Sequence, residues 1–318
     1  MIAAMERRQV LLYALSIAFG VLLGLGLPGL AGFLEHAITP VLMALLYATF
    51  LAIPFSQVLK ALRDWRFLGL ILALNFVAGP VVVWLVTRPL AAEQSLLVGA
   101  LFVLLCPCVD YVIVFAGLAG GDTKRLLSVT PVLMGAQMLL LPFYLWLFAG
   151  PSVVGAVEFG PFLEAFLLFI VVPLAAAIAT QAVARRSAAA RGWESGVAAA
   201  MVPLMMATLA VVVASQIAQV SMQVRRLWIV VPVFVAFALI MLAAALVCAR
   251  VVRMDAAGTR ALAFSAVTRN SLVVLPLVLA LPAQFALAPL VVVTQTLVEL
   301  VLMVILVRML PRWVRQAC

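Results

Sequence analysis

The stretch SLLVGALFVLLCPCVDYVIVFAGL, which runs from Ser95 to Leu118, decides the class of the fold. It is long enough to cross a bilayer, since a spanning α-helix needs about 20 mostly apolar residues. Pro107 and the carboxylate of Asp110 nevertheless lie near its middle. Proline removes a backbone donor and breaks a helix, and a charge at the bilayer centre costs at least about 2.5–3.5 kcal/mol. The stretch therefore predicts a transmembrane helix that is interrupted for a functional reason.

The composition of the whole chain agrees with a membrane protein. Of its 318 residues, 68% are hydrophobic and 10% are charged, and the mean hydropathy is +1.32. A soluble domain carries about 25% charged residues and about 45–50% apolar ones. A disordered chain is poorer still in apolar residues and has a high net charge. This composition therefore excludes both classes, and we expect an integral protein whose main partner is the lipid bilayer.

Apolar runs of spanning length occur ten times, and the breaks between them are short and rich in charged or turn residues. Their length favours helices over the strands of a membrane β-barrel, which need about ten residues each. We therefore expect an all-α polytopic membrane protein with ten transmembrane helices. The predicted spans are residues 9–29, 37–59, 67–87, 95–118, 126–149, 161–183, 197–220, 227–249, 261–281 and 285–307.

The basic residues orient these spans. If the N-terminus is cytoplasmic, most of the 20 Lys and Arg residues fall in cytoplasmic segments, as the positive-inside rule requires. The pair Arg225 and Arg226 is the one feature that disagrees. The formal net charge of +9 therefore marks a membrane face and predicts no nucleic-acid partner. We expect a plasma (inner) membrane protein with both termini cytoplasmic.

The fourth and ninth predicted spans are both interrupted in the middle, at Cys106–Asp110 and at Thr268–Ser271. They are the fourth spans of two five-helix halves, about residues 1–150 and 151–318. Because five is odd, the second half must enter the membrane from the opposite side. Discontinuous helices at matching positions of inverted halves indicate the central site of a transporter. We expect one transmembrane transporter domain, residues 1–318, built as a 5+5 inverted repeat with broken, crossed helices four and nine.

Three ionisable residues lie within the predicted spans: Asp110, Arg269 and Glu299. Such residues usually face a cavity and pair with another group. Asp110 and Arg269 have opposite charges and lie on the two interrupted spans, so we expect them to neutralise each other beside the solute path. A purely structural ion pair is the alternative. The two acids, Asp110 and Glu299, are the candidate proton carriers.

Cys106 and Cys108 flank the proline of the fourth span. Thiols are soft ligands that suit copper(I), zinc or a trivalent arsenic centre. Simple packing of two small residues is the alternative. We count both cysteines as candidate substrate-binding residues, together with Arg269, Asn270 and Ser271 in the other break. We expect no cofactor and no resident metal.

The sequence from Leu105 to Asp122 resembles the fourth span of the arsenical-resistance-3 family of arsenite efflux permeases. Cys108 falls on the family cysteine, and Leu118-Ala-Gly-Gly-Asp122 matches the family's Leu-Ala-x-Gly-Asp loop. That family belongs to the bile acid:sodium symporter superfamily, so the resemblance implies ten spans, a 5+5 inverted repeat and crossed helices four and nine. Further similarities occur at Arg63–Leu70, Asn75, Gly79-Pro80, Ala263–Ala266 and Asn270.

The charged positions depart from the family pattern. Pro107 stands where the family usually has an arginine, and Leu272 stands where it has a glutamate. Sodium-coupled members of the superfamily carry a glutamate and a glutamine at the positions of Ser265 and Arg269. A guanidinium there would repel a bound cation strongly at low dielectric. We therefore expect transport without sodium coupling.

The resemblance predicts a secondary active transporter, not an enzyme, that exports arsenite or a related metalloid. Cys108 and Cys106 would contact the soft solute, and Asp110 would carry the proton under the control of Arg269. The alternative is an organic-anion transporter of the bile-acid or keto-acid type, in which Arg269 binds the carboxylate. Either way the partner is a small inorganic or organic anion or metalloid solute.

An intramembrane enzyme was the third possibility. Metal-type proteolysis requires several histidines, and the chain has only His36. The aspartyl type needs two acids placed together in the membrane, and only Asp110 and Glu299 are available for that role. Both observations disfavour an enzyme.

Overall fold

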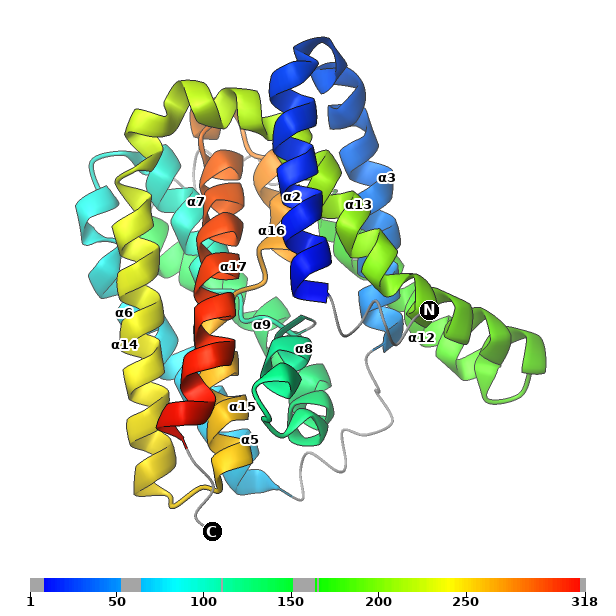
Figure 1. Cartoon of the computed structure of the whole chain (residues 1–318), viewed down its shortest axis with the longest axis vertical. Coiled ribbons are helices and arrows are strands. Elements are labelled where there is room, and N and C mark those ends of the chain that lie inside the picture. The colour runs from blue at the N-terminus through cyan, green and yellow to red at the C-terminus, as the bar shows by residue number, and fades with distance from the viewer. Residues whose placement is uncertain (1–8, 53–63, 110, 151–163, 165, 315–318) are drawn as a thin grey trace. The chain divides into compact units, whose positions relative to one another are not determined.

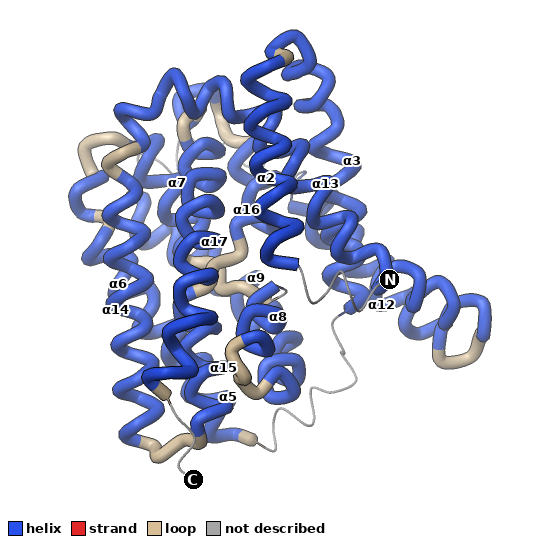
Figure 2. Tube along the Cα trace, in the orientation of Figure 1, coloured by secondary structure: helices blue, strands red, loops and turns tan. Residues whose placement is uncertain are grey.

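The computed structural model describes residues 9–52, 64–109, 111–150, 164 and 166–314. Within these residues the chain is helical and contains no strand (Figure 2). The chain divides into two compact units, of which unit 1 comprises residues 1–53 and 159–226 and unit 2 comprises residues 54–158 and 227–318. Figure 1 labels the main helices along the chain.

Unit 1 is held together by small residues and by one polar cluster. On α2, Gly20 and Gly24 lie against the backbone of α13; a Cβ added at Gly20 would come within 2.8 Å of the carbonyl oxygen of Ala210. Glycines spaced four apart let two helices approach closely in a membrane. The helices of unit 1 are α2 (Gln9–Gly26), η1 (Pro28–Leu30), α3 (Ala31–Ala52), η5 (Leu167–Val171), α12 (Val172–Ala184) and α13 (Ala188–Leu227).

The polar cluster of unit 1 centres on Tyr47 of α3. Its hydroxyl lies 2.9 Å from Oγ1 of Thr180 on α12 and accepts a hydrogen bond of 3.0 Å from Nε1 of Trp193 on α13. Three helices are therefore fastened to one phenol in a region otherwise packed by apolar side chains.

Unit 2 contains the two interrupted spans. Within it α14 packs on α15, and α17 packs on α7, α14 and α16. Its helices are α5 (Trp65–Ala73), η3 (Leu74–Ala78), α6 (Gly79–Val86), η4 (Arg88–Leu90), α7 (Gln94–Leu104), α8 (Tyr111–Leu118), α9 (Thr123–Ala149), α14 (Val230–Val251), α15 (Ala256–Val267), α16 (Ser271–Leu279), η6 (Ala283–Phe285) and α17 (Ala288–Trp313).

A π-helical turn, η3, joins α5 to α6 without ending the helix. Pro80 follows this turn and has no N–H to give to the carbonyl of Phe76, four residues earlier. The hydroxyl of Tyr144 on α9 donates to that carbonyl instead. The π turn η5 of unit 1 likewise precedes a proline, Pro173. Such turns are frequent at functional sites, and η3 carries Asn75.

Every one of the ten predicted spans falls on helix in the described residues, but only seven helical stretches are long and apolar enough to cross a membrane. The three that fall short are α2, which counts among the shorter apolar helices at Leu11–Gly26, and the two interrupted spans. The ten-span count and the inverted repeat stay predictions. The seven stretches are Gly32–Ala52, Trp65–Val86, Thr123–Ala149, Leu167–Ala184, Ala188–Ile217, Arg225–Val251 and Ala283–Trp313.

Candidate functional site

The gap between α7 and α8 pairs with the gap between α15 and α16 in unit 2. Pro107 faces Arg269 in a single antiparallel bridge. The N–H of Cys108 donates to the carbonyl of Thr268 at 3.2 Å, and the N–H of Asn270 donates to the carbonyl of Cys106 at 2.7 Å. Figure 2 shows both gaps as loop among helices. Irregular backbone leaves polar groups that lipid cannot satisfy, so each gap supplies the hydrogen bonds that the other needs.

Two helices begin directly after these gaps, α8 at Tyr111 and α16 at Ser271. The side chain of Asn270 caps α16 by accepting a hydrogen bond of 3.4 Å from the N–H of Val273. The first N–H groups of a helix carry a partial positive charge that favours an anion or an electron-rich oxygen. The paired gaps are therefore an electropositive part of an otherwise apolar unit.

Arg269 is the largest fully buried side chain described, with 0% of its surface exposed. Its Nη2 donates to Oδ1 of Asn75 at 3.2 Å and to the carbonyl of Ala266. The guanidinium carbon lies 4.7 Å from the centre of the Phe237 ring, a distance that allows a cation–π interaction. Nε and the other Nη have no hydrogen-bond partner among the described residues. Arginine stays charged in proteins, so two unpartnered N–H groups here are costly without a further ligand.

Asn75 connects the π turn to the paired gaps. Its Nδ2 donates to the carbonyl of Ile71 at 3.0 Å and to Oγ of Ser265 at 3.2 Å, while its Oδ1 accepts from Arg269. All three of these contacts lie inside unit 2, and Asn75 is only 1% exposed. Asn75 therefore orients the guanidinium and fixes its distance from α15.

Glu299 on α17 binds the backbone of Arg269 and not its guanidinium. Its Oε2 accepts from the N–H of Arg269 at 2.9 Å and from Nε2 of Gln295 at 2.5 Å. Its Oε1 lies 2.5 Å from the hydroxyl of Tyr111, which also lies 2.7 Å from the carbonyl oxygen of Arg269. The carboxyl group therefore reaches both ends of the Arg269 residue, directly and through Tyr111.

The two cysteines of the break are buried thiols, with Cys106 1% and Cys108 0% exposed. Both lie close enough to Arg269 to interact with it electrostatically. The described residues include no group of three or more His, Cys, Asp or Glu side chains that could hold a metal ion. A soft solute would have to use one or both thiols together with nitrogen and hydroxyl donors.

Four buried donors of residues 269 to 271 have no hydrogen-bond partner among the described residues. They are Nε and one Nη of Arg269, Nδ2 of Asn270 and Oγ of Ser271. Buried polar groups are nearly always hydrogen-bonded, so a cluster of unpartnered donors at one helix N-terminus is unusual. The arrangement fits a solute that offers several acceptor oxygens.

The structure brings together most of the site that the sequence predicts. Cys106 and Cys108 pair with the segment that holds Arg269, Asn270 and Ser271, and Glu299 binds Arg269. Asp110 lies outside the described residues, so its predicted pairing with Arg269 stays a prediction. Two additional members are the amide of Asn75 and the phenol of Tyr111. A polar side chain directly after the break of an apolar span is the signal that could have identified Tyr111.

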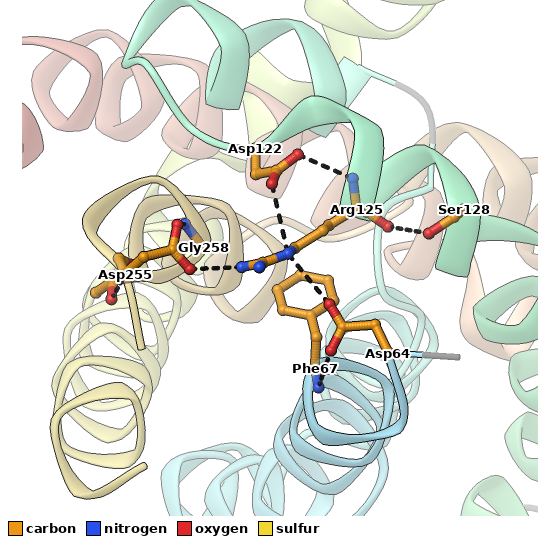
Figure 3. A network of polar contacts seen from close by, with 8 residues as sticks. Asp64, Phe67, Asp122, Arg125, Ser128, Asp255 and Gly258 are labelled. Carbon is orange, nitrogen blue, oxygen red and sulfur yellow. Dashed lines mark hydrogen bonds and ion pairs between the residues drawn. The ribbon is translucent and has the colours of Figure 1, made fainter. Parts of the chain in front are cut away.

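A second polar cluster lies at the helix ends of unit 2, around Arg125 (Figure 3). Its guanidinium forms ion pairs with Asp64 at 3.1 Å, Asp122 at 3.4 Å and Asp255 at 2.5 Å. Each aspartate is also the N-cap of a helix: Asp64 caps α5, Asp122 caps α9 and Asp255 caps α15. One arginine therefore joins the N-termini of three helices.

Asp255 lies outside the helices and is half-exposed. Partial burial alone would raise the pKa of Asp255, but the hydrogen bond and charge of Arg125 and the N–H of Gly258 hold the pKa below its ordinary value. Asp255 is therefore a carboxylate at neutral pH, and its cap and its ion pair act together.

Residues 39–227, more than half of the chain, match the Sodium Bile acid symporter family. The chain is also similar to the Arsenical-resistance protein Acr3 of Corynebacterium glutamicum, with 26% identity over 184 residues. That similarity covers 52% of this chain and 49% of the relative, so the match spans about half the length of each.

Proposed function

This chain belongs to the Sodium Bile acid symporter family, and from that premise we propose that it is a secondary active transporter that exports arsenite or a related metalloid. It is a multi-pass membrane protein with seven helices of spanning length in its described part. The similarity to an arsenical-resistance protein supports the solute, and the arginine in place of a sodium ligand supports transport without sodium.

The observation that carries this proposal is the pairing of two buried thiols with a cluster of unpartnered donors. Cys108, with Cys106, contacts the arsenic atom, for which sulfur is the preferred ligand. Each As–S bond that forms replaces an As–OH group and releases one water. The N–H groups of Arg269 and Asn270 and the hydroxyl of Ser271 hold the remaining oxygens.

The proposed architecture has ten spans arranged as two inverted five-helix halves, about residues 1–150 and 151–318, in one transporter domain. In this arrangement α7 with α8 is the fourth span and α15 with α16 is the ninth, and the two cross where their gaps pair. Both termini lie in the cytoplasm at the plasma (inner) membrane. The backbone bonds between Cys106–Cys108 and Thr268–Asn270 support the crossing.

Coupling in this proposal uses protons, because the site holds acids within the membrane and an arginine in place of a sodium ligand. Asp110 and Glu299 are the proton carriers. Glu299 is suited to this role since it is buried and bonded to the backbone of the solute site. A proton that enters drives the metalloid out.

A second candidate is export or uptake of an organic anion of the bile-acid or keto-acid type. A specific observation favours it: Nε and Nη1 of a fully buried guanidinium lack partners, and a carboxylate is a charged acceptor that would bind strongly to either of them. In that case the cysteines only pack.

The test is arsenite accumulation in everted membrane vesicles energised by a proton gradient. We expect Cys108→Ser to lose most of the activity. Cys248→Ser is the matched control, because Cys248 is a thiol on α14 outside the paired gaps and its removal should leave transport unchanged. Full activity of Cys108→Ser would reject the thiol role.

The second candidate is tested in the same vesicles with a labelled carboxylate. Transport that is independent of sodium and is abolished by Arg269→Ala, combined with no arsenite transport by the native chain, would move the organic anion to first place.

A further inference from the structure

The hydroxyl of Tyr111 lies between two acceptors. One is the carbonyl oxygen of Arg269, at 2.7 Å, which can only accept. The other is Oε1 of Glu299, at 2.5 Å. Both contacts are shorter than the usual spacing of oxygens that share no hydrogen, so each needs a hydrogen between its two oxygens. A phenol supplies only one.

The second hydrogen has one place to reside. Oε2 of Glu299 already accepts from the N–H of Arg269 and from the amide of Gln295, so it faces two donors and has no use for a proton of its own. Among the described residues, Oε1 is hydrogen-bonded only to the phenol oxygen. We infer that Glu299 is protonated in this conformation, that its Oε1–H donates to Tyr111, and that Tyr111 donates to the carbonyl of Arg269.

The surroundings of Glu299 agree with a neutral acid. An ionised carboxylate is strongly disfavoured when it is buried, and although the charge of Arg269 acts on Glu299, the two described side chains form no ion pair. No second described carboxylate faces Glu299. The groups that surround it are Tyr111 from α8, Arg269 from the gap between α15 and α16, Phe234 and Phe237 from α14, and Gln295 from α17 itself.

Space for a proton acceptor lies beside Glu299. A cavity of about 10 Å³, close to the volume that one water needs, adjoins Glu299 and is lined mainly by α14 and α17 side chains such as Phe237 and Gln295. Release transfers the hydrogen of Oε1 to such a water and leaves a carboxylate; only that O–H bond breaks.

Loss of the proton changes how the solute site is held. A carboxylate takes the phenol hydrogen for itself, so the carbonyl of Arg269 loses its donor, and the Glu299–Tyr111 pair then holds the Arg269 backbone by its N–H only. The carboxylate also attracts the two unpartnered N–H groups of the guanidinium. Glu299 and Tyr111 therefore form a proton site whose occupancy sets the position of Arg269. Its role in transport rests on the proposed function, but its existence does not.

Infrared difference spectroscopy of the purified protein between high and low pH tests the site directly, because a protonated carboxyl has its own C=O band. We expect a band that Glu299→Gln removes. Tyr111→Phe should keep this band but move it to higher frequency, since the carboxyl loses its acceptor. Tyr144→Phe is the matched control, because Tyr144 also donates to a backbone carbonyl but is hydrogen-bonded to no carboxyl group of the described residues, and it should leave the band unmoved.

Transport supplies the second readout. Glu299→Gln keeps one donor and one acceptor in the position of the protonated acid, so it should fold and exchange solute for solute while it loses proton-driven accumulation. Proton-driven accumulation by Glu299→Gln, or the absence of any carboxyl band that Glu299→Gln removes, would overturn the inference. A Glu299-dependent band in a protein that transports no arsenite would support the proton site and reject the proposed solute.

Discussion

Replacing Arg125 by methionine tests whether one guanidinium joins three helix N-termini. Methionine keeps the length and apolar stem of arginine but removes the charge. The three aspartates would keep their caps, because each accepts from a backbone N–H of its own helix. The variant therefore isolates the ion pairs from the helix caps and leaves three carboxylates facing one another without a cation.

The expected loss is modest because the cluster is partly exposed. Arg125 is 36% exposed, and its partners are 28–53% exposed. Solvated pairs contribute about 0.2–1 kcal/mol each, and three pairs that share one cation add less than three separate ones. The contact of Arg125 with the Phe67 ring, at 5.9 Å, adds about 0.5 kcal/mol. We expect the free energy of unfolding to fall by about 2 kcal/mol at low ionic strength.

Urea unfolding of the purified protein in detergent, followed by circular dichroism, measures this difference. The salt dependence is the specific readout, because the Debye length falls to about 3 Å at 1 M salt and most of the difference should disappear. Arg66→Met is the control: Arg66 is exposed, lies over the Trp65 ring and forms no ion pair with a described residue. A loss at Arg125 no larger than at Arg66, or one that salt does not reduce, would refute the reasoning.

Three further predictions concern single side chains. The pKa of Asp255 in the folded protein lies below the ordinary value of 3.8, so the ionised side chain contributes to stability above that pH. This contribution is lost as the pH falls through the folded-state pKa. The melting temperatures of the native chain and of Asp255→Asn should therefore converge in acid. Gly20→Leu should force α2 away from α13 and lower the melting temperature, at a cost of about 1–3 kcal/mol. Gly26→Leu is the control and should not lower it, because Gly26 has open space around it. Equal melting temperatures of the two variants would contradict the close packing. Arg269→Lys should keep the fold but lose solute binding in an equilibrium assay, because a single ammonium cannot replace the several N–H donors of a planar guanidinium. Unaltered affinity would show that Arg269 does not bind the solute.

The sequence predicts the gaps well because their signals are local. A proline between two cysteines in an apolar run, and a run of Thr-Arg-Asn-Ser in another, indicate interrupted helices wherever they occur. The pairing of the two gaps follows only from the inverted-repeat argument. The structure adds the hydrogen bonds that the pairing makes, which no local pattern specifies.

The parts that could not be predicted depend on tertiary contacts. Each aspartate at a helix start predicts a cap, but nothing in the three separate segments indicates that Asp64, Asp122 and Asp255 converge on Arg125. Basic residues near span ends were interpreted only as markers of the cytoplasmic face. Likewise the position of Tyr111 between Glu299 and Arg269 depends on how α8 and α17 pack, and hydropathy carries no information on that.

The π turn at Leu74–Ala78 makes the site sensitive to the length of the chain. A π turn holds one residue more than an α turn of the same rise, so the extra residue is accommodated without changing how the two flanking helices face. Deleting one residue of this turn would restore regular α geometry and leave the side chains of α5 and α6 in nearly the same phase. Inside the turn, however, the side chain of Asn75 and the carbonyl of Phe76 would be displaced and could no longer both face their partners. A deletion here should therefore keep the helix but disturb the contacts of Asn75 with Arg269 and of Phe76 with Tyr144.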